Sequence, residues 1–164
     1  MKWLRMLGLA AAVALGTWLW MALHPSPEKL IRKQLDGLIH AVSFGPGEGY
    51  LAKLAGAQRV GNFFSTNVDV QISAPGGQEH RLAGRQEIQQ GALAARATLK
   101  GLSVTFPDIT VIVNADGESA LADVALEARI TGEVDTIVQE LKITLHKIDG
   151  KWLIVKVETV RTLS

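Results

Sequence analysis

The chain has 164 residues, with seventeen Lys or Arg, sixteen Asp or Glu, no cysteine and a formal net charge of +1. The lack of cysteine excludes disulfides, lipoprotein attachment and thiolate metal sites. Because the basic residues form no block along the chain, no nucleic acid is expected as a partner.

The N-terminal segment differs in composition from the rest of the chain. Lys2 and Arg5 lead into Met6–Leu23, eighteen residues without a charged side chain. As a helix this stretch would span about 27 Å, close to the hydrocarbon core of a bilayer, and the basic residues before it predict a cytoplasmic N-terminus. The sequence therefore predicts an anchor in the inner (cytoplasmic) membrane over residues 1–24. Residues 25–164 would form one domain on the periplasmic side.

A cleaved secretory signal is the alternative interpretation of this segment. Signal peptides also place basic residues before an apolar stretch, and the leader is typical of bacteria. Cleavage needs small residues in an A-x-A pattern, whereas Trp18 to Pro25 offers mainly bulky ones. The uncleaved anchor is thus preferred, and either interpretation exports the domain.

Three helices are predicted within the exported domain. Ser26 is a residue type that caps helices, and apolar residues recur at helical spacing over 27–43. A glycine- and proline-rich turn separates this helix from a second one over 50–60. Gly84 opens a third helix, which covers 85–100.

Strands are predicted on both sides of the third helix. Apolar and polar residues alternate over 68–73, with a short extended piece at 80–82. The chain then keeps a period of two over residues 104–113, 119–130, 136–146 and 152–160. Turn signals between these segments indicate hairpins. The predicted fold class is therefore α+β, with three helices packed on a curved antiparallel sheet.

Three motifs, in this order, resemble the nuclear transport factor 2-like superfamily, which includes ketosteroid isomerase, scytalone dehydratase and the SnoaL-type polyketide cyclases. They are Phe63-Phe64-Ser65-Thr66-Asn67-Val68, Ala83-Gly84-Arg85-Gln86-Glu87-Ile88 and Asp149-Gly150-Lys151-Trp152-Leu153-Ile154. The resemblance covers residues 27–162 and implies a cystatin-like cone that commonly dimerises through its sheet. Enzymes of the superfamily place an acid, a base or a tyrosine inside the cone. Because one fold hosts many activities, the resemblance implies the fold rather than a reaction.

The alternation along the strands predicts which side chains face into the cone. In the last strand Leu153, Val155 and Val157 are expected inside, and Trp152 and Ile154 outside. The inward sets of all the long strands are then almost purely aliphatic. This pattern is typical of a filled hydrophobic core or of an apolar pocket without an acid or base, and the sequence leaves both open.

Asp69, His40 and His80 are the candidate catalytic residues, and each has a simpler structural interpretation. His40 lies beside the apolar stripe of the first helix, and His80 stands between two charged residues near a turn. Asp69 would face the cone only if its apolar neighbours faced outward. No nucleophile motif, phosphate loop or metal-ligand spacing among the four histidines is present, so neither a cofactor nor a metal is expected.

Two functions remain open at this point. The preferred one is a non-catalytic protein-interaction or dimerisation module, because the outer sheet face is expected to mix Trp152, Ile154, Leu121 and Ala125 with charges. Its partner would be a second copy or a membrane-associated protein, which the anchor keeps nearby. The alternative is a binder of small apolar ligands or a SnoaL-like isomerase, cyclase or hydratase, because Ala120, Ala122 and Ala128 are small enough to leave room in the cone.

Overall fold

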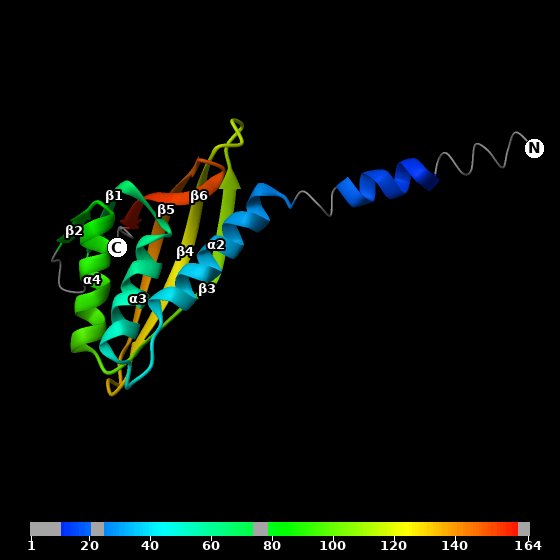
Figure 1. The fold of residues 1–164 in the computed structure, drawn as a ribbon. Helices are drawn as coiled ribbons and strands as arrows, with labels where there is room; N and C mark the ends of the chain where they lie inside the picture. Colours follow the sequence, from blue (N-terminus) through cyan, green and yellow to red (C-terminus); the bar gives the residue numbers. More distant parts are fainter. Residues whose placement is uncertain (1–10, 21–24, 74–78, 161–164) are drawn as a thin grey trace, which may run out of the picture.

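A curved six-stranded sheet with three helices against one face makes up the domain (Figure 1). In the computed structural model the described residues are 11–20, 25–73 and 79–160, and residues 11–20 form a further helix. The predicted α+β class, with three helices on a curved sheet, is confirmed.

The predicted membrane anchor lies partly outside the described residues, because residues 1–10 and 21–24 are not among them. The ten described residues of the segment are helical and exposed throughout. Within the described part of the chain, no helix combines the length and the apolarity needed to cross a membrane. The anchor therefore stays a prediction.

The three helices of the domain begin and end within two residues of their predicted limits. They are α2 (Pro27–Val42), α3 (Tyr50–Gly61) and α4 (Arg85–Thr98). The Ser26 hydroxyl accepts a hydrogen bond from the Lys29 N–H at 3.4 Å, as expected for an N-cap. At the start of α4, the Glu87 carboxylate accepts one from the Ala83 N–H at 2.7 Å. Local side-chain hydrogen bonds thus stabilise the starts of α2 and α4, whereas α3 begins after Gly49 without one.

The sheet has the strand order β2-β1-β6-β5-β4-β3. The strands are β1 (Phe64–Ser73), β2 (Glu79–Ala83), β3 (Leu102–Val113), β4 (Ser119–Ile130), β5 (Thr136–Ile148) and β6 (Lys151–Thr159). The predicted hairpins connect β3 to β6 as an antiparallel meander. The sheet is not wholly antiparallel as predicted, because β1 lies parallel to β6. This pairing joins the early β1–β2 hairpin to the end of the chain.

A β-bulge in β6 changes which of its side chains face the helices. Val155 is an extra residue opposite β5, and such an insertion interrupts the alternation of the strand. Trp152 and Ile154 are consequently buried, at 5% and 0% exposure, while Leu153 stays half-buried. The predicted orientation is therefore wrong for these residues, and it is right for Val157, which is buried.

The hydrophobic core lies between the sheet and the helices. Its most buried large side chains are Ile31, Leu35, Val68, Ile143, Leu145 and Ile154. In β4, Ala120 and Ala122 are fully buried while Asp123 is exposed, as the alternation predicted. All members of the core cluster belong to residues 31–157, so the domain has a core that does not depend on the helix at 11–20.

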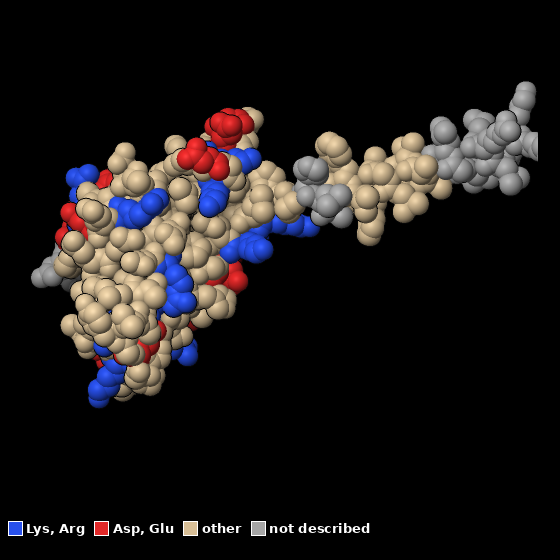
Figure 2. All heavy atoms as spheres, viewed as in Figure 1, with Lys and Arg blue, Asp and Glu red and all other residues tan. Residues whose placement is uncertain are grey.

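The molecular surface carries charges of both signs. On the face shown in Figure 2, Lys and Arg side chains form several small groups with acidic and uncharged side chains between them. On the outer face of the sheet, Lys156 and Glu158 form an ion pair at 2.8 Å. Exposed pairs of this kind contribute little to stability.

Candidate functional site

An apolar cavity of about 290 Å³ lies between the helices and the sheet. All three helices of the domain and all six strands contribute to its walls. Large apolar side chains dominate the lining, among them Phe64, Ile88, Phe106, Leu141, Ile143 and Ile154. Of the two interiors that the sequence left open, a filled core and an apolar pocket, the structure contains the pocket.

Small residues of α4 make room for this cavity. Gly91, Ala92 and Ala95 lie along the side of α4 that faces it. Ala120, Ala122 and Ala128 of β4, which the sequence suggested as the source of space, do not line the cavity. They are packed in the core instead.

Arg96 is the single charged residue among the described residues that line the cavity. Its side chain is only 2% exposed, and its Nη1 donates hydrogen bonds to both carboxylate oxygens of Glu48, at 2.7 and 2.6 Å. Its Nη2 donates to the Ala41 carbonyl oxygen at 2.6 Å, and its Cζ lies 4.7 Å from the centroid of the Phe44 ring. The buried guanidinium is thus compensated by an anion, a carbonyl oxygen and an aromatic face.

Gly56 of α3 provides the space through which the guanidinium of Arg96 passes. A Cβ atom at position 56 would lie 2.5 Å from the Arg96 Cζ, closer than real side chains pack. The sequence analysis missed this cluster. A signal was present, because Arg96 follows Ile88 and Ala92 at intervals of four residues and so interrupts an apolar helix face.

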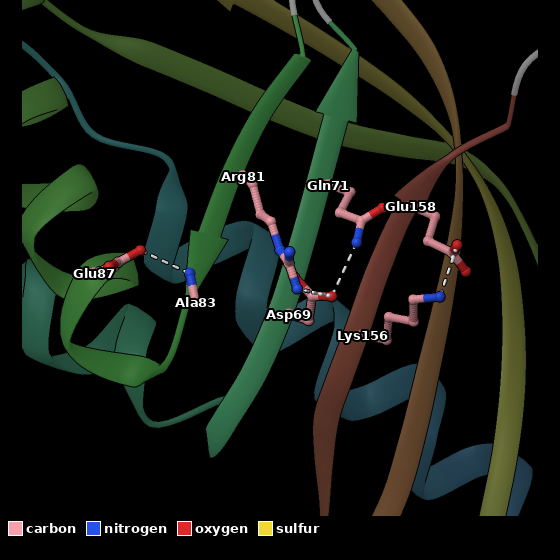
Figure 3. Close-up of polar contacts among 7 residues, drawn as sticks. All are labelled: Asp69, Gln71, Arg81, Ala83, Glu87, Lys156 and Glu158. Carbon is pink, nitrogen blue, oxygen red and sulfur yellow. Dashed lines mark hydrogen bonds and ion pairs between the residues drawn. The ribbon is translucent and has the colours of Figure 1, made fainter.

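Asp69 lies on the outer face of the sheet and does not line the cavity (Figure 3). Its Oδ1 accepts a hydrogen bond from Arg81 Nε at 2.9 Å, and its Oδ2 accepts one from Gln71 Nε2 at 2.9 Å. The hydrogen bond from Arg81 is the main reason why the pKa of the Asp69 carboxyl lies below its ordinary value. The carboxylate is therefore ionised and only weakly basic at neutral pH.

The two candidate histidines also lie away from the cavity. His40 is on the exposed side of α2, where its Nδ1 donates to the Asp36 carbonyl oxygen at 2.8 Å and its side chain is 76% exposed. His80 is an exposed residue of β2. The structure does not bring Asp69, His40 and His80 together. Among residues 11–20, 25–73 and 79–160, no group of three or more His, Asp or Glu side chains is placed to hold a metal ion.

Comparison with known proteins identifies the fold. No protein-family model matches the chain, and no curated protein matches its sequence. Solved structures do match. A proposed scytalone dehydratase from Novosphingobium aromaticivorans is 17% identical with a TM-score of 0.62, over 83% of this chain and 84% of that one. A proposed aromatic ring hydroxylase from the same organism is 12% identical with a TM-score of 0.63, over 82% and 88%.

A nuclear transport factor 2-like protein of unknown function from Pseudomonas putida is also similar, with 10% identity and a TM-score of 0.62, over 82% of this chain and 85% of that one. These similarities show that the chain has the nuclear transport factor 2-like, or cystatin-like, fold that the three sequence motifs implied. At such identities they show the fold alone.

Proposed function

We propose that the domain binds a small apolar molecule in its cavity without transforming it. The observation that carries this proposal is the cavity of about 290 Å³ lined by apolar side chains. Arg96, the one charged group among the described residues that line it, is already bound by Glu48. A concave, mostly apolar site of this size with few polar groups is typical of small-molecule binding.

The arrangement of the polar groups favours binding over an isomerase, cyclase or hydratase reaction. Such reactions move protons, and a proton-transferring side chain must lie within about 3 Å of the reacting atoms. Asp69, His40 and His80 lie outside the cavity. The names of the proposed dehydratase and hydroxylase describe those proteins, and we transfer from them only the likeness of a cavity-forming fold.

A titration of residues 25–164 with 1-octanol tests the proposal. Burying eight carbons at about 0.8 kcal/mol each gives about 6.4 kcal/mol, or a Kd of about 20 μM at the tightest, before the entropic costs of binding. We expect saturable binding by calorimetry, with NMR shifts confined to methyl groups that line the cavity, such as those of Ile88 and Ile143. Methyl groups outside it, such as that of Ala120, serve as the internal control. Unsaturable shifts spread over the surface would refute the proposal.

Self-association through the outer face of the sheet is a second candidate function. Burial of Trp152 and Ile154 removes part of the original reason for it. Large apolar side chains are nevertheless exposed on that face, most of all Val138 at 63% and Ile112 at 57%. Sedimentation velocity of the wild type and of Ile112→Lys tests it: a dimer that the substitution dissociates would support the interface, and a wild-type monomer at high concentration would refute it.

We also propose that Met6–Leu23 tethers the domain to the cytoplasmic membrane, with residues 25–164 on the extracytoplasmic side. The support is the charge-free stretch after Lys2 and Arg5, together with an exposed apolar helix at residues 11–20. Alkaline extraction and protease treatment of spheroplasts test this topology. The chain should stay with the membrane and be cleaved from outside. Its release at high pH, or its protection from protease, would contradict the tether.

A further inference from the structure

A second hollow adjoins the cavity at the end of the cone. It also measures about 290 Å³, and residues 45–48, α3, α4 and Thr131 contribute to it. Phe44 and Arg96 line both spaces and therefore form the wall between them. The loop at residues 45–48, which lines this hollow, follows the end of α2 that lies away from the N-terminal helix (Figure 1).

The second hollow carries an excess of positive charge. Lys53 and Lys100 line it together with Arg96, and Glu48 is the single acidic residue among the described residues that line either space. The carboxylate of Glu48 accepts two hydrogen bonds from the guanidinium of Arg96. An anion that took its place would lie in a hollow lined by three cationic side chains, with the displaced Glu48 as the competing anion.

Burial of Arg96 is costly for the fold, which argues for a role beyond packing. An ion pair in a protein interior is often no more stabilising than apolar residues of the same size, because both charges lose their hydration. An apolar residue at position 96 would continue the face formed by Ile88 and Ala92. The chain instead places a guanidinium there and accommodates it with a glycine at position 56.

Glu48 is carried by a loop that packs little against the rest of the domain. The loop contains Gly45, Gly47 and Gly49, and a Cβ atom at any of the three would have no neighbour within 4 Å. Gly47 has a φ of +84°, a conformation that few other residues adopt. The Glu48 side chain can therefore leave Arg96 through a change in this loop, without repacking of the core.

We propose that the ligand is an amphiphile with an anionic head, a carboxylate or a phosphate. Its apolar tail fills the cavity, and its head replaces Glu48 on Arg96, with Lys53 and Lys100 adding attraction. The inference rests on the proposed apolar-ligand function and specifies its ligand class. A cavity of about 150 Å³ accommodates benzene, so the present 290 Å³ fits a tail of about eight to twelve carbons.

Matched titrations of residues 25–164 with octanoate and 1-octanol test the inference, because the two ligands share a tail and differ in the head. We expect octanoate to bind about tenfold more tightly than 1-octanol, since hydrogen bonds between oppositely charged groups are stronger than those between neutral groups. Glu48→Gln removes the competing charge and should raise octanoate affinity a further several-fold while 1-octanol binding stays within about twofold. Octyl phosphate, titrated in parallel, distinguishes a phosphate head from a carboxylate head.

A pair of exposed lysines provides a control that does not disturb the core. Lys100→Glu should weaken octanoate binding about fivefold, whereas Lys147→Glu, which makes the same charge change on β5 away from both spaces, should leave it unchanged. Equal affinity for octanoate and 1-octanol, or equal effects of the two lysine variants, would overturn the inference while the apolar-ligand proposal stood. Failure of both ligands to bind would overturn the proposed function itself.

Discussion

Replacing Ala92 by leucine should stabilise the domain, because the new side chain enters empty space. Ala92 is a half-buried residue of α4 that lines the cavity. Leucine adds three carbons, and burying each is worth about 0.8 kcal/mol, which gives at most about 2.4 kcal/mol. The two residues have nearly equal helix propensity. Since position 92 stays partly exposed, we expect the free energy of unfolding to rise by about 1–2 kcal/mol in urea titrations of residues 25–164.

The same substitution at Ala122 is the matched comparison. Ala122 is fully buried and does not line the cavity, so leucine there must displace its neighbours and should cost about 1–3 kcal/mol. Ala92→Leu should also weaken 1-octanol binding by at least tenfold, because it occupies the ligand's volume. If both variants lost stability to a similar extent, the Ala92 side chain would not face empty space. If Ala92→Leu were stabilising yet bound 1-octanol as the wild type does, the cavity would not be the binding site.

Further predictions concern glycine packing and acid stability. Gly56→Ala should lower the free energy of unfolding by about 1–3 kcal/mol, because the added Cβ collides with Arg96. Gly91→Ala in α4 should raise it by about 0.5–1 kcal/mol, since its Cβ would meet nothing closer than 3.8 Å. Similar effects of the two substitutions would contradict the packing around Arg96. The pKa of Asp116 lies below its ordinary value, chiefly because the Glu118 backbone N–H donates to the carboxylate. Its stabilising effect is therefore complete above the unfolded-state pKa of about 4 and is lost as pH falls through the lower folded-state pKa. In urea titrations from pH 7 to pH 2, Asp116→Asn should be less stable than the wild type at neutral pH, and the difference should shrink in acid; a constant difference would contradict the lowered pKa.

Local signals in the sequence were sufficient to predict the helices and hairpins. At the last hairpin, Asp149 and Gly150 both have positive φ, 50° and 77°, as a tight two-residue turn requires. The orientation of β6 could not be predicted in the same way. The bulge at Val155 depends on the pairing of β6 with β5, and the alternation along one strand does not indicate how that strand pairs with its neighbour.

The cavity and the Arg96 cluster depend on distances between elements, which are harder to predict. An alternating strand indicates which face is apolar, but not how far the opposing helix stands from it. The sequence therefore indicated an apolar interior without deciding whether it was filled. Arg96 was recognisable as a charge on an apolar helix face, yet its partner Glu48 is 48 residues earlier in the chain. Only the tertiary structure brings the two together.

The parallel pairing of β1 with β6 has a consequence for the order in which the domain folds. The Ser73 N–H donates to the Thr159 hydroxyl at 3.1 Å, across 86 residues of chain. Contacts between such distant segments form slowly, because the entropy of closing the loop is lost before the contacts stabilise it. A nascent chain that ends before Lys151 has a β1–β2 hairpin with no neighbouring strand. The domain thus completes its sheet, and closes its apolar cavity, only after β6 has been synthesised.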